Sequence, residues 1–335
     1  MPLDTIYLVR HGHRMHWTID YATGTYHSAF PTPTGNPADP TLTAHGVRQS
    51  QELADYIVSE KLSGPRPWRI YSSPFYRCLQ TIRPSVEALD GLDSAARNNT
   101  GRREKGVRIE NGLGEWFGSS TYFDHPSPAP VSELYQHFPS IIPNPSTSPE
   151  NKIHVIPSSR GETIPQLHNR VATTLAAIIA DADADIRAEE EQEAKQHPNG
   201  KPNSKAILIC SHAATLIAMG RALTGNMPDD PNTGDFHVYT AGLSTYVRRK
   251  AQQDIEYYTE EEGSSLIAAG TKLIPESDVR VPIWKGGKGV GGGWDCVGNC
   301  DCSFLSGGEE RGWHFSGEES FDTGSMGAAD EAAKL

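Results

Sequence analysis

Short apolar runs alternate with longer amphipathic segments through the first 250 residues of the chain. Runs that are rich in β-branched and aromatic residues and that end at polar turns are typical of buried strands. They predict strands at 5–9, 68–71, 107–110 and 206–210, and a more alternating pattern predicts a fifth strand within 238–248.

Helical spacing of apolar residues fills the intervals between these runs, at 46–60, 75–89, 165–195 and 213–223. The third helix begins with a proline in its first turn, where the missing N–H would have no helical partner. Strands that alternate with helices favour a parallel sheet covered on both faces. We therefore expect an α/β fold, a three-layer α/β/α sandwich with a mostly parallel sheet.

The composition changes after about residue 250. The segment 285–293 is glycine-rich, and the last fifteen residues are small and polar. This predicts a main domain over residues 1–250 and a C-terminal extension over residues 251–335, partly ordered and ending in a disordered tail. Aromatic residues at 294, 304, 313 and 315 indicate that the extension docks on its own domain or on a protein partner.

Charge and cysteine content narrow the possible partners and compartments. The net charge of −12 predicts a surface that repels nucleic acid and acidic membranes, so an anion site needs a local basic cluster. No apolar run is long enough to span a membrane, and the N-terminus does not resemble a secretory signal. Five cysteines, an odd number for a disulfide framework, favour a reducing compartment, cytoplasmic or nuclear.

A basic cluster does follow the first predicted strand, as Arg10-His11-Gly12-His13-Arg14. Ligands of open α/β sheets bind beyond the carboxyl ends of the strands. Gly12 allows the backbone to turn tightly there, and the planar fork of arginine suits phosphate oxygens. His11, flanked by Arg10 and Arg14, is therefore the candidate nucleophile of an anion-binding site.

Two further strands deliver similar residues to the same edge. His212 follows strand 206–210 and precedes a helix, whose first N–H groups favour an anion. Arg77 lies in the first turn of the helix that follows strand 68–71. Alone, a Ser-His at a strand end is more often a structural histidine, and Arg-His-Gly is more often a surface turn. Their joint occurrence after successive strands indicates one site.

Four motifs, each next to a predicted strand or helix, carry a family resemblance: Leu8-Val9-Arg10-His11-Gly12, Leu42-Thr43-x-x-Gly46-x-x-Gln49, Ser72-Ser73-Pro74-x-x-Arg77-x-x-Gln80-Thr81 and Ser211-His212. Together they resemble the histidine phosphatase superfamily, which is also called phosphoglycerate mutase-like. The resemblance spans about residues 5 to 225 and implies a phosphatase domain within residues 1–250. It leaves the Pro-rich stretch 21–40, which we interpret as a loop forming one wall of the pocket, unexplained.

Two features suggest a subgroup. Arg14 gives the Arg-His-Gly-x-Arg form, and Glu115-Trp116 ends the run that starts at Arg108. The run resembles the Glu-Trp motif of the suppressor-of-T-cell-receptor-signalling phosphatases. It is also similar to the phosphatase-like tau subunit of the fungal RNA polymerase III initiation factor. Cofactor-dependent mutases differ around both motifs, which makes a glycolytic mutase less favoured.

The resemblance implies a two-step reaction without metal or cofactor. His11 would attack phosphorus, and water would then hydrolyse the phosphohistidine. Glu115 would donate the proton to the leaving group, and we expect its neighbour Trp116 to raise the pKa of that carboxyl by desolvation. The plain alternative for Glu115 is a surface glutamate. The charge on the phosphoryl group would be neutralised by four basic residues, Arg10, Arg14, Arg77 and His212.

Other candidate motifs favour structural interpretations. His13 and His16 are expected to be solvated loop residues, and the three aspartates at 181, 183 and 185 are expected to form a solvated helix end. The glycines at 286–289 are expected to form a flexible linker, since no Gly-Lys-Ser/Thr follows them. Cys296, Cys300 and Cys302, with His314, have no usual zinc spacing, so we expect no metal site there.

Two functions from different classes remain. The first is a metal-independent phosphatase acting on a phosphorylated small molecule or a phosphoprotein. The alternative is a phosphatase-fold subunit of a transcription or other assembly, which contacts protein partners through the C-terminal extension. Every expected catalytic position is filled, which favours activity. Because all four motifs precede residue 225, removal of the chain after about residue 285 is expected to leave catalysis largely intact.

Overall fold

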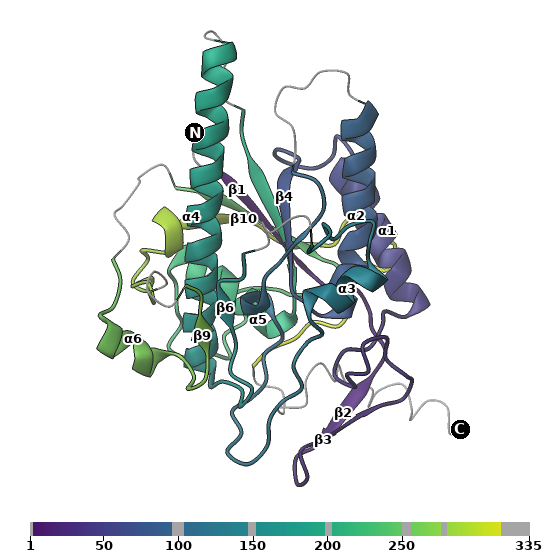
Figure 1. Ribbon diagram of the computed structural model, residues 1–335, viewed down its shortest axis with the longest axis vertical. Helices are drawn as coiled ribbons and strands as arrows, with labels where there is room; N and C mark the ends of the chain where they lie inside the picture. Colours follow the sequence, from purple (N-terminus) through teal and green to yellow (C-terminus); the bar gives the residue numbers. More distant parts are fainter. Residues whose placement is uncertain are drawn as a thin grey trace.

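A six-stranded sheet forms the centre of the molecule (Figure 1). The computed structural model describes residues 3–95, 104–146, 152–197, 203–249, 256–275 and 280–315. In spatial order the strands are β10 (Trp294–Asp301), β8 (Leu243–Arg248), β1 (Thr5–Arg10), β7 (Ala206–Ser211), β4 (Pro67–Ser72) and β5 (Arg108–Ile109).

Four central strands run parallel, in the order β1, β7, β4 and β5, and β8 joins β1 antiparallel. In the register of the central pair, Arg10 lies opposite Ser211, so His11 and His212 follow the strand ends side by side. All residues of β1, β4 and β7 are buried, as expected for parallel strands covered on both faces.

Helices cover both faces of the sheet. α1 (Ala44–Val58) and α2 (Tyr76–Ala95) pack on one face, and α4 (Ile164–Gln196) and α5 (Ala213–Thr224) pack on the other (Figure 1). Each pair closes a separate apolar core against the strands. The predicted three-layer sandwich with a mostly parallel sheet is confirmed.

Capping residues explain where the helices begin and where α5 ends. Thr43 accepts from the backbone N–H of Gly46 at the start of α1. Thr163 and Gln166 form a capping box at the start of α4. Gly225 adopts a φ of 78° after α5, a left-handed conformation that suits glycine. The sequence pattern placed these helix boundaries within a few residues.

The stretch 21–40 contains a strand that the pattern did not predict. β2 (Trp17–Asp20) and β3 (Thr25–Ser28) form an antiparallel hairpin. A turn closed by Asp20 and Gly24 joins them, with Gly24 at a φ of 70°. The strands are short and half exposed, so they leave little apolar signal in the sequence.

Short elements complete the described chain. They are η1 (Asn111–Leu113), α3 (Val131–His137), β6 (Val155–Ile156), α6 (Glu260–Leu266), β9 (Lys272–Leu273) and η2 (Val290–Gly292). None of the helices in the described ranges combines the length and apolarity that a bilayer crossing requires.

The chain over residues 280–315 differs from the predicted appendage. β10 extends the central sheet, and Trp284 and Trp294 lie fully buried in the core under α4 and α5. The expected flexible linker at 286–289 is tightly packed only at its last glycine. A Cβ on Gly289 would lie 2.2 Å from the carbonyl oxygen of Leu223, whereas Gly286 and Gly287 border open space. The expected disordered tail, 316–335, lies outside the described residues.

The aspartates near the middle of α4 are also not simply solvated. Asp183 is buried, pairs with Arg248 at 2.8 Å and accepts from the backbone N–H of Leu3. Asp185 pairs with Arg69 at 2.8 Å, and Asp181 lies 3.2 Å from a ring nitrogen of His154. Each of the three carboxylates pairs with a different segment of the chain. Residues two positions apart on a helix point to different sides, so each aspartate meets a different partner.

Candidate active site

The loop after β1 is held by residues of the three other motifs. The N–H of His11 donates to Ser211 O at 3.0 Å, and the N–H of Gly12 donates to Thr81 Oγ1 at 2.9 Å. The N–H of His13 donates to Gln49 Oε1 at 2.8 Å. A Cβ on Gly12 would lie 2.9 Å from a carbonyl oxygen of α1, so only glycine lets the loop approach that closely. The motif residues Gln49 and Thr81 are therefore structural supports of the His11 loop.

His11 is buried and has a defined tautomer. Its Nδ1 lies 2.9 Å from the carbonyl oxygen of Gly12, so Nδ1 carries the proton and Nε2 carries the lone pair. Burial lowers the pKa of His11 well below its usual value, and the charges of Arg77 and Arg10 lower it further. The ring is therefore neutral near neutral pH, as a nucleophile must be.

His212 lies 5.4 Å from His11 between ring centroids, at the N-cap of α5. Its Nε2 contacts Ser73 Oγ at 2.7 Å, and its Nδ1 lies 3.2 Å from Glu115 Oε2. Burial lowers the pKa of His212, but Cys78 and the Glu115 carboxylate outweigh that effect, and the net pKa is raised. The pKa of His11 is therefore lowered and the pKa of His212 is raised, so His212 holds its proton to a higher pH than His11 does.

Arg77 is clamped by a residue that sequence reasoning missed. Its Nη1 donates to Ala38 O at 2.9 Å and to Asp39 Oδ1 at 3.2 Å, while Nη2 donates to Glu115 Oε2 at 3.0 Å. Asp39 is fully buried and also accepts from the N–H of Tyr76. Burial raises the pKa of Asp39 to about 6, against the lowering effect of Arg77. The only sequence signal was its place in the stretch expected to wall the pocket.

Arg10 and Arg14 flank the nucleophile as expected, and both are buried. Arg10 Nη1 donates to the carbonyls of Val238 at 2.7 Å and Arg311 at 2.5 Å. Arg14 Nη1 donates to Met15 O, and its guanidinium carbon lies 5.5 Å from the Trp17 ring.

Glu115 lies inside the site rather than on the surface, with its side chain 10% exposed. Burial alone would raise the pKa of this carboxyl. The charges of His212, Arg77 and Arg14 lower it by more, so the net pKa is below its usual value. Desolvation thus acts on this carboxyl in the expected direction, but in the unliganded site the cations outweigh it. Trp116 directs its indole N–H to Glu162 O, whereas Glu115 meets three cations.

The arrangement is built to hold an anion. The Glu115 carboxylate oxygen already sits at the point where donors from Arg77 and His212 meet. A phosphoryl oxygen at that point would find the same donors, and bidentate arginine suits phosphate. The nearest ligand atoms of His11, Glu115 and His212 also lie within 4.8 Å of one another, a spacing that fits a metal ion. The surrounding guanidinium groups make the local potential positive, which favours an anion over a divalent cation.

Several sequence candidates lie outside this convergence. His13 Nδ1 contacts Thr43 Oγ1 at 2.8 Å, and His16 is exposed. Cys296, Cys300 and Cys302 do not gather with His314 into a metal-ligand set in the described ranges.

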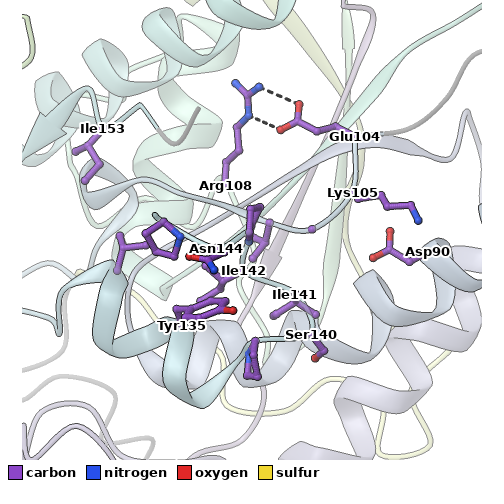
Figure 2. Close-up of a pocket in the computed structure, with 16 residues that line it drawn as sticks. Asp90, Glu104, Lys105, Arg108, Tyr135, Ser140, Ile141, Ile142, Asn144 and Ile153 are labelled. Atoms are coloured by element: carbon purple, nitrogen blue, oxygen red, sulfur yellow. Dashed lines mark hydrogen bonds and ion pairs between the residues drawn. The ribbon is translucent and has the colours of Figure 1, made fainter. Parts of the chain in front are cut away.

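A larger cavity, of about 870 Å³, lies beside β5 and α3 (Figure 2). Most of its lining residues are proline, glycine, tyrosine or aliphatic residues, and its Arg108 is paired with Glu104 at 2.6 Å. None of the predicted site residues lines it. This cavity and the chemistry therefore lie in different places.

The site also includes a residue from the far end of the chain. Trp313 lines a cavity of about 10 Å³ beside the nucleophile. The other lining residues are Arg10, His11, Glu115, Trp116, Ala213 and Ala214. Sequence analysis noted Trp313 as a docking aromatic, but no spacing rule connects it with a loop three hundred residues earlier.

Comparison with known proteins agrees with the four motifs. The family model of the histidine phosphatase superfamily (branch 1) matches residues 6–261. The chain belongs to the histidine phosphatase superfamily. The family resemblance predicted from the motifs is confirmed, and the match ends before β10 and the segment that carries Trp313.

One curated relative is the transcription factor tau 55 kDa subunit of Saccharomyces cerevisiae, which is 29% identical over 320 residues. The match covers 94% of this chain and 59% of that protein, so the chain spans about three fifths of the length of its relative.

Solved structures of similar proteins include the ecdysone phosphate phosphatase of Bombix mori, which is 17% identical with a TM-score of 0.46. That match covers 76% of this chain and 96% of the other. A putative alpha-ribazole-5'-P phosphatase of Escherichia coli is 20% identical with a TM-score of 0.37, over 74% of this chain and 92% of the other.

Proposed function

We propose that the chain is a metal-independent phosphatase that hydrolyses a phosphomonoester through a phosphohistidine at His11. The observation that carries this proposal is the convergence of a neutral, buried His11 with Arg77, His212 and Glu115 on one anion-binding point. Phosphoryl transfer requires mainly positioning and charge neutralisation, and these residues supply both.

In the first step, His11 Nε2 attacks phosphorus in line with the leaving oxygen. The N–P bond forms, the P–O bond breaks, and the leaving oxygen takes a proton from Glu115. In the second step, water attacks phosphorus, Glu115 takes a proton from the water, and the N–P bond breaks to release phosphate and neutral His11. The transferred group is held throughout by the four basic residues Arg10, Arg14, Arg77 and His212.

The low pKa of Glu115 in the unliganded site does not prevent it from acting as an acid. A bound phosphoryl dianion would take over the contacts with Arg77 and His212 that now hold the carboxylate ionised. It would also place negative charge beside Glu115, and both changes raise the pKa of a carboxyl. Substrate binding and protonation of Glu115 are thus coupled in this proposal.

The test is rapid quench of the enzyme with phosphorus-labelled substrate into base, since phosphohistidine is acid-labile. We expect label on His11, and loss of label and activity in His11→Ala. His13→Ala is the matched control, because this histidine belongs to the same loop but bonds Thr43 instead. Label on another residue, or activity lost in chelator and restored by divalent metal, would contradict the mechanism.

The sequence similarity to the yeast tau 55 kDa subunit supports a second role. We propose that the chain also acts in the nucleus as a subunit of a transcription assembly, because the similarity covers 94% of its length. Affinity purification of tagged chain should recover other tau-type subunits, equally from wild type and His11→Ala. Recovery of no such subunit from either would reject this role and leave the phosphatase proposal untouched.

A further inference from the structure

Residues 310–315, here called the C-terminal strap, cross the catalytic edge of the sheet. At one end, the backbone carbonyl of Glu310 accepts from the N–H of Thr240 at 3.1 Å. At the other, Phe315 is buried with its ring 5.5 Å from that of Trp116 and 5.8 Å from that of His168. Because both ends are anchored in the fold, the strap has a defined path over the site.

The strap is tied to the loop that carries the nucleophile. Glu310 Oε2 accepts from Gln49 Nε2 at 2.9 Å and lies 2.5 Å from His45 Nε2. Gln49 in turn accepts from the N–H of His13. One glutamine thus joins the His11 loop to the strap.

The next residue of the strap holds an arginine of the phosphate site. Arg311 has a φ of 50°, a left-handed conformation that a non-glycine residue rarely adopts. In this conformation its carbonyl accepts from Arg10 Nη1 at 2.5 Å, opposite the carbonyl of Val238. Two carbonyls on one nitrogen fix the direction of the Arg10 guanidinium.

Trp313 then fills the space beside the reacting groups. Its ring lies 6.2 Å from that of Trp116, at an interplanar angle of 74°, and 4.9 Å from that of Phe315. The cavity left between Trp313, His11 and Glu115 is about 10 Å³, enough for about one water molecule.

We propose that Trp313 is a specificity-determining residue of the phosphatase site: with Trp116 it forms a wall that excludes phosphomonoesters whose leaving group is bulky next to the phosphoryl group. The inference rests on the proposed function. In-line attack by His11 puts the leaving group beside its proton donor Glu115, and the wall bounds that space. The substrate class is therefore a phosphate on a slender, unbranched carbon.

Trp313 lies outside the family pattern, since the family match ends at residue 261. Removal of the chain after residue 285 would remove the strap with β10, so the expectation that truncation spares catalysis does not fit the structure.

The experiment compares kcat/KM for ethyl phosphate and 1-naphthylmethyl phosphate, two alkyl esters that differ in bulk. Trp313→Ala should raise the ratio of bulky to slender substrate about tenfold or more, the scale on which hydrophobic pockets discriminate. Trp313→Phe should give an intermediate ratio. His314→Ala, at an exposed neighbouring position, should leave the ratio unchanged.

A binding arm separates this inference from the proposed function. Dissociation constants of ethylphosphonate and 1-naphthylmethylphosphonate, which cannot be hydrolysed, should change in the same ratio. If wild type binds both phosphonates but hydrolyses no ester, the proposed function fails and the wall can still be judged. Unchanged ratios in Trp313→Ala, or in Trp313→Phe if the alanine variant does not fold, overturn the inference.

Discussion

His11 and His212 are both fully enclosed, yet their neighbours give them opposite protonation tendencies. Burial lowers the pKa of His11, and the charges of Arg77 and Arg10 lower it further. His212 faces the Glu115 carboxylate, which opposes the effect of burial, and its pKa is raised. A histidine is charged below its pKa, so His11 should gain charge only below pH 6.5 and His212 should keep charge above it.

Imidazole ¹⁵N chemical shifts measured against pH test this difference. At pH 6.5 we expect His11 to be neutral with the proton on Nδ1 and His212 to be charged. A His11 that is charged at pH 7 would contradict its assignment as nucleophile.

Glu115→Gln tests the proton donor through the leaving group. An alkoxide leaves poorly and needs a proton in the transition state, whereas p-nitrophenolate is stable as an anion. The variant should therefore lose much of the 10²–10⁴-fold that general acid catalysis supplies for alkyl phosphates, and far less for p-nitrophenyl phosphate.

Two controls accompany that measurement of kcat/KM. Glu87→Gln, a partly exposed position on α2, should change neither substrate. Arg77→Ala should damage both substrates alike, by about 3 kcal/mol, because it contacts the phosphoryl group common to them. Equal losses on both substrates in Glu115→Gln would remove Glu115 from the role of acid.

At the site, sequence reasoning reached the residues that immediately follow strands and missed those that come from elsewhere. Arg10, His11 and His212 could be placed together because parallel strands end at one edge. Asp39 and Trp313 could not, because their contacts depend on how a loop and the strap fold back over that edge.

Among the elements, β10 shows most clearly how a strand can be hidden in a sequence. Only Trp294 and Cys300 are buried, the positions between them alternate between exposed and half-buried, and the strand follows a glycine-rich turn. Its pairing with β8 also has two register shifts, so the two strands are not paired residue for residue. Strands β1, β4 and β7 were predictable because each is a continuous apolar run buried on both faces.

Substitution at Trp294 tests whether β10 is part of the core. Trp294 is fully buried among residues of α4 and α5, and Trp294→Ala should lower the free energy of unfolding by about 3–5 kcal/mol. Urea denaturation followed by circular dichroism gives this value. Val297→Ala, on the same strand but 64% exposed, should change it by less than about 0.5 kcal/mol. Similar effects of both variants would show that β10 docks only loosely.

On the scale of the whole molecule, several arginines are enclosed in the fold. Arg10, Arg77, Arg170 and Arg221 are all fully buried. Arg170 is matched by Glu162 at 2.9 Å and Arg221 by Asp235, so these charges are used within the fold. Because these four arginines are enclosed, they add no exposed basic side chains to a chain whose net charge is −12.

This distribution predicts that the isolated chain does not bind duplex DNA, even though its relative is a transcription factor subunit. Protein–DNA affinity comes largely from phosphate contacts by exposed basic residues, and it rises steeply as salt is lowered. An acidic surface behaves in the opposite way, because the Debye length grows from about 8 Å at 0.15 M salt to about 30 Å at 0.01 M, which extends the repulsion. Fluorescence anisotropy of a labelled 30-base-pair duplex should therefore stay flat on titration with the chain at both salt concentrations. Saturable binding that tightens at low salt would reveal an exposed basic surface, and contact with DNA would then have to be added to the role of this chain in its assembly.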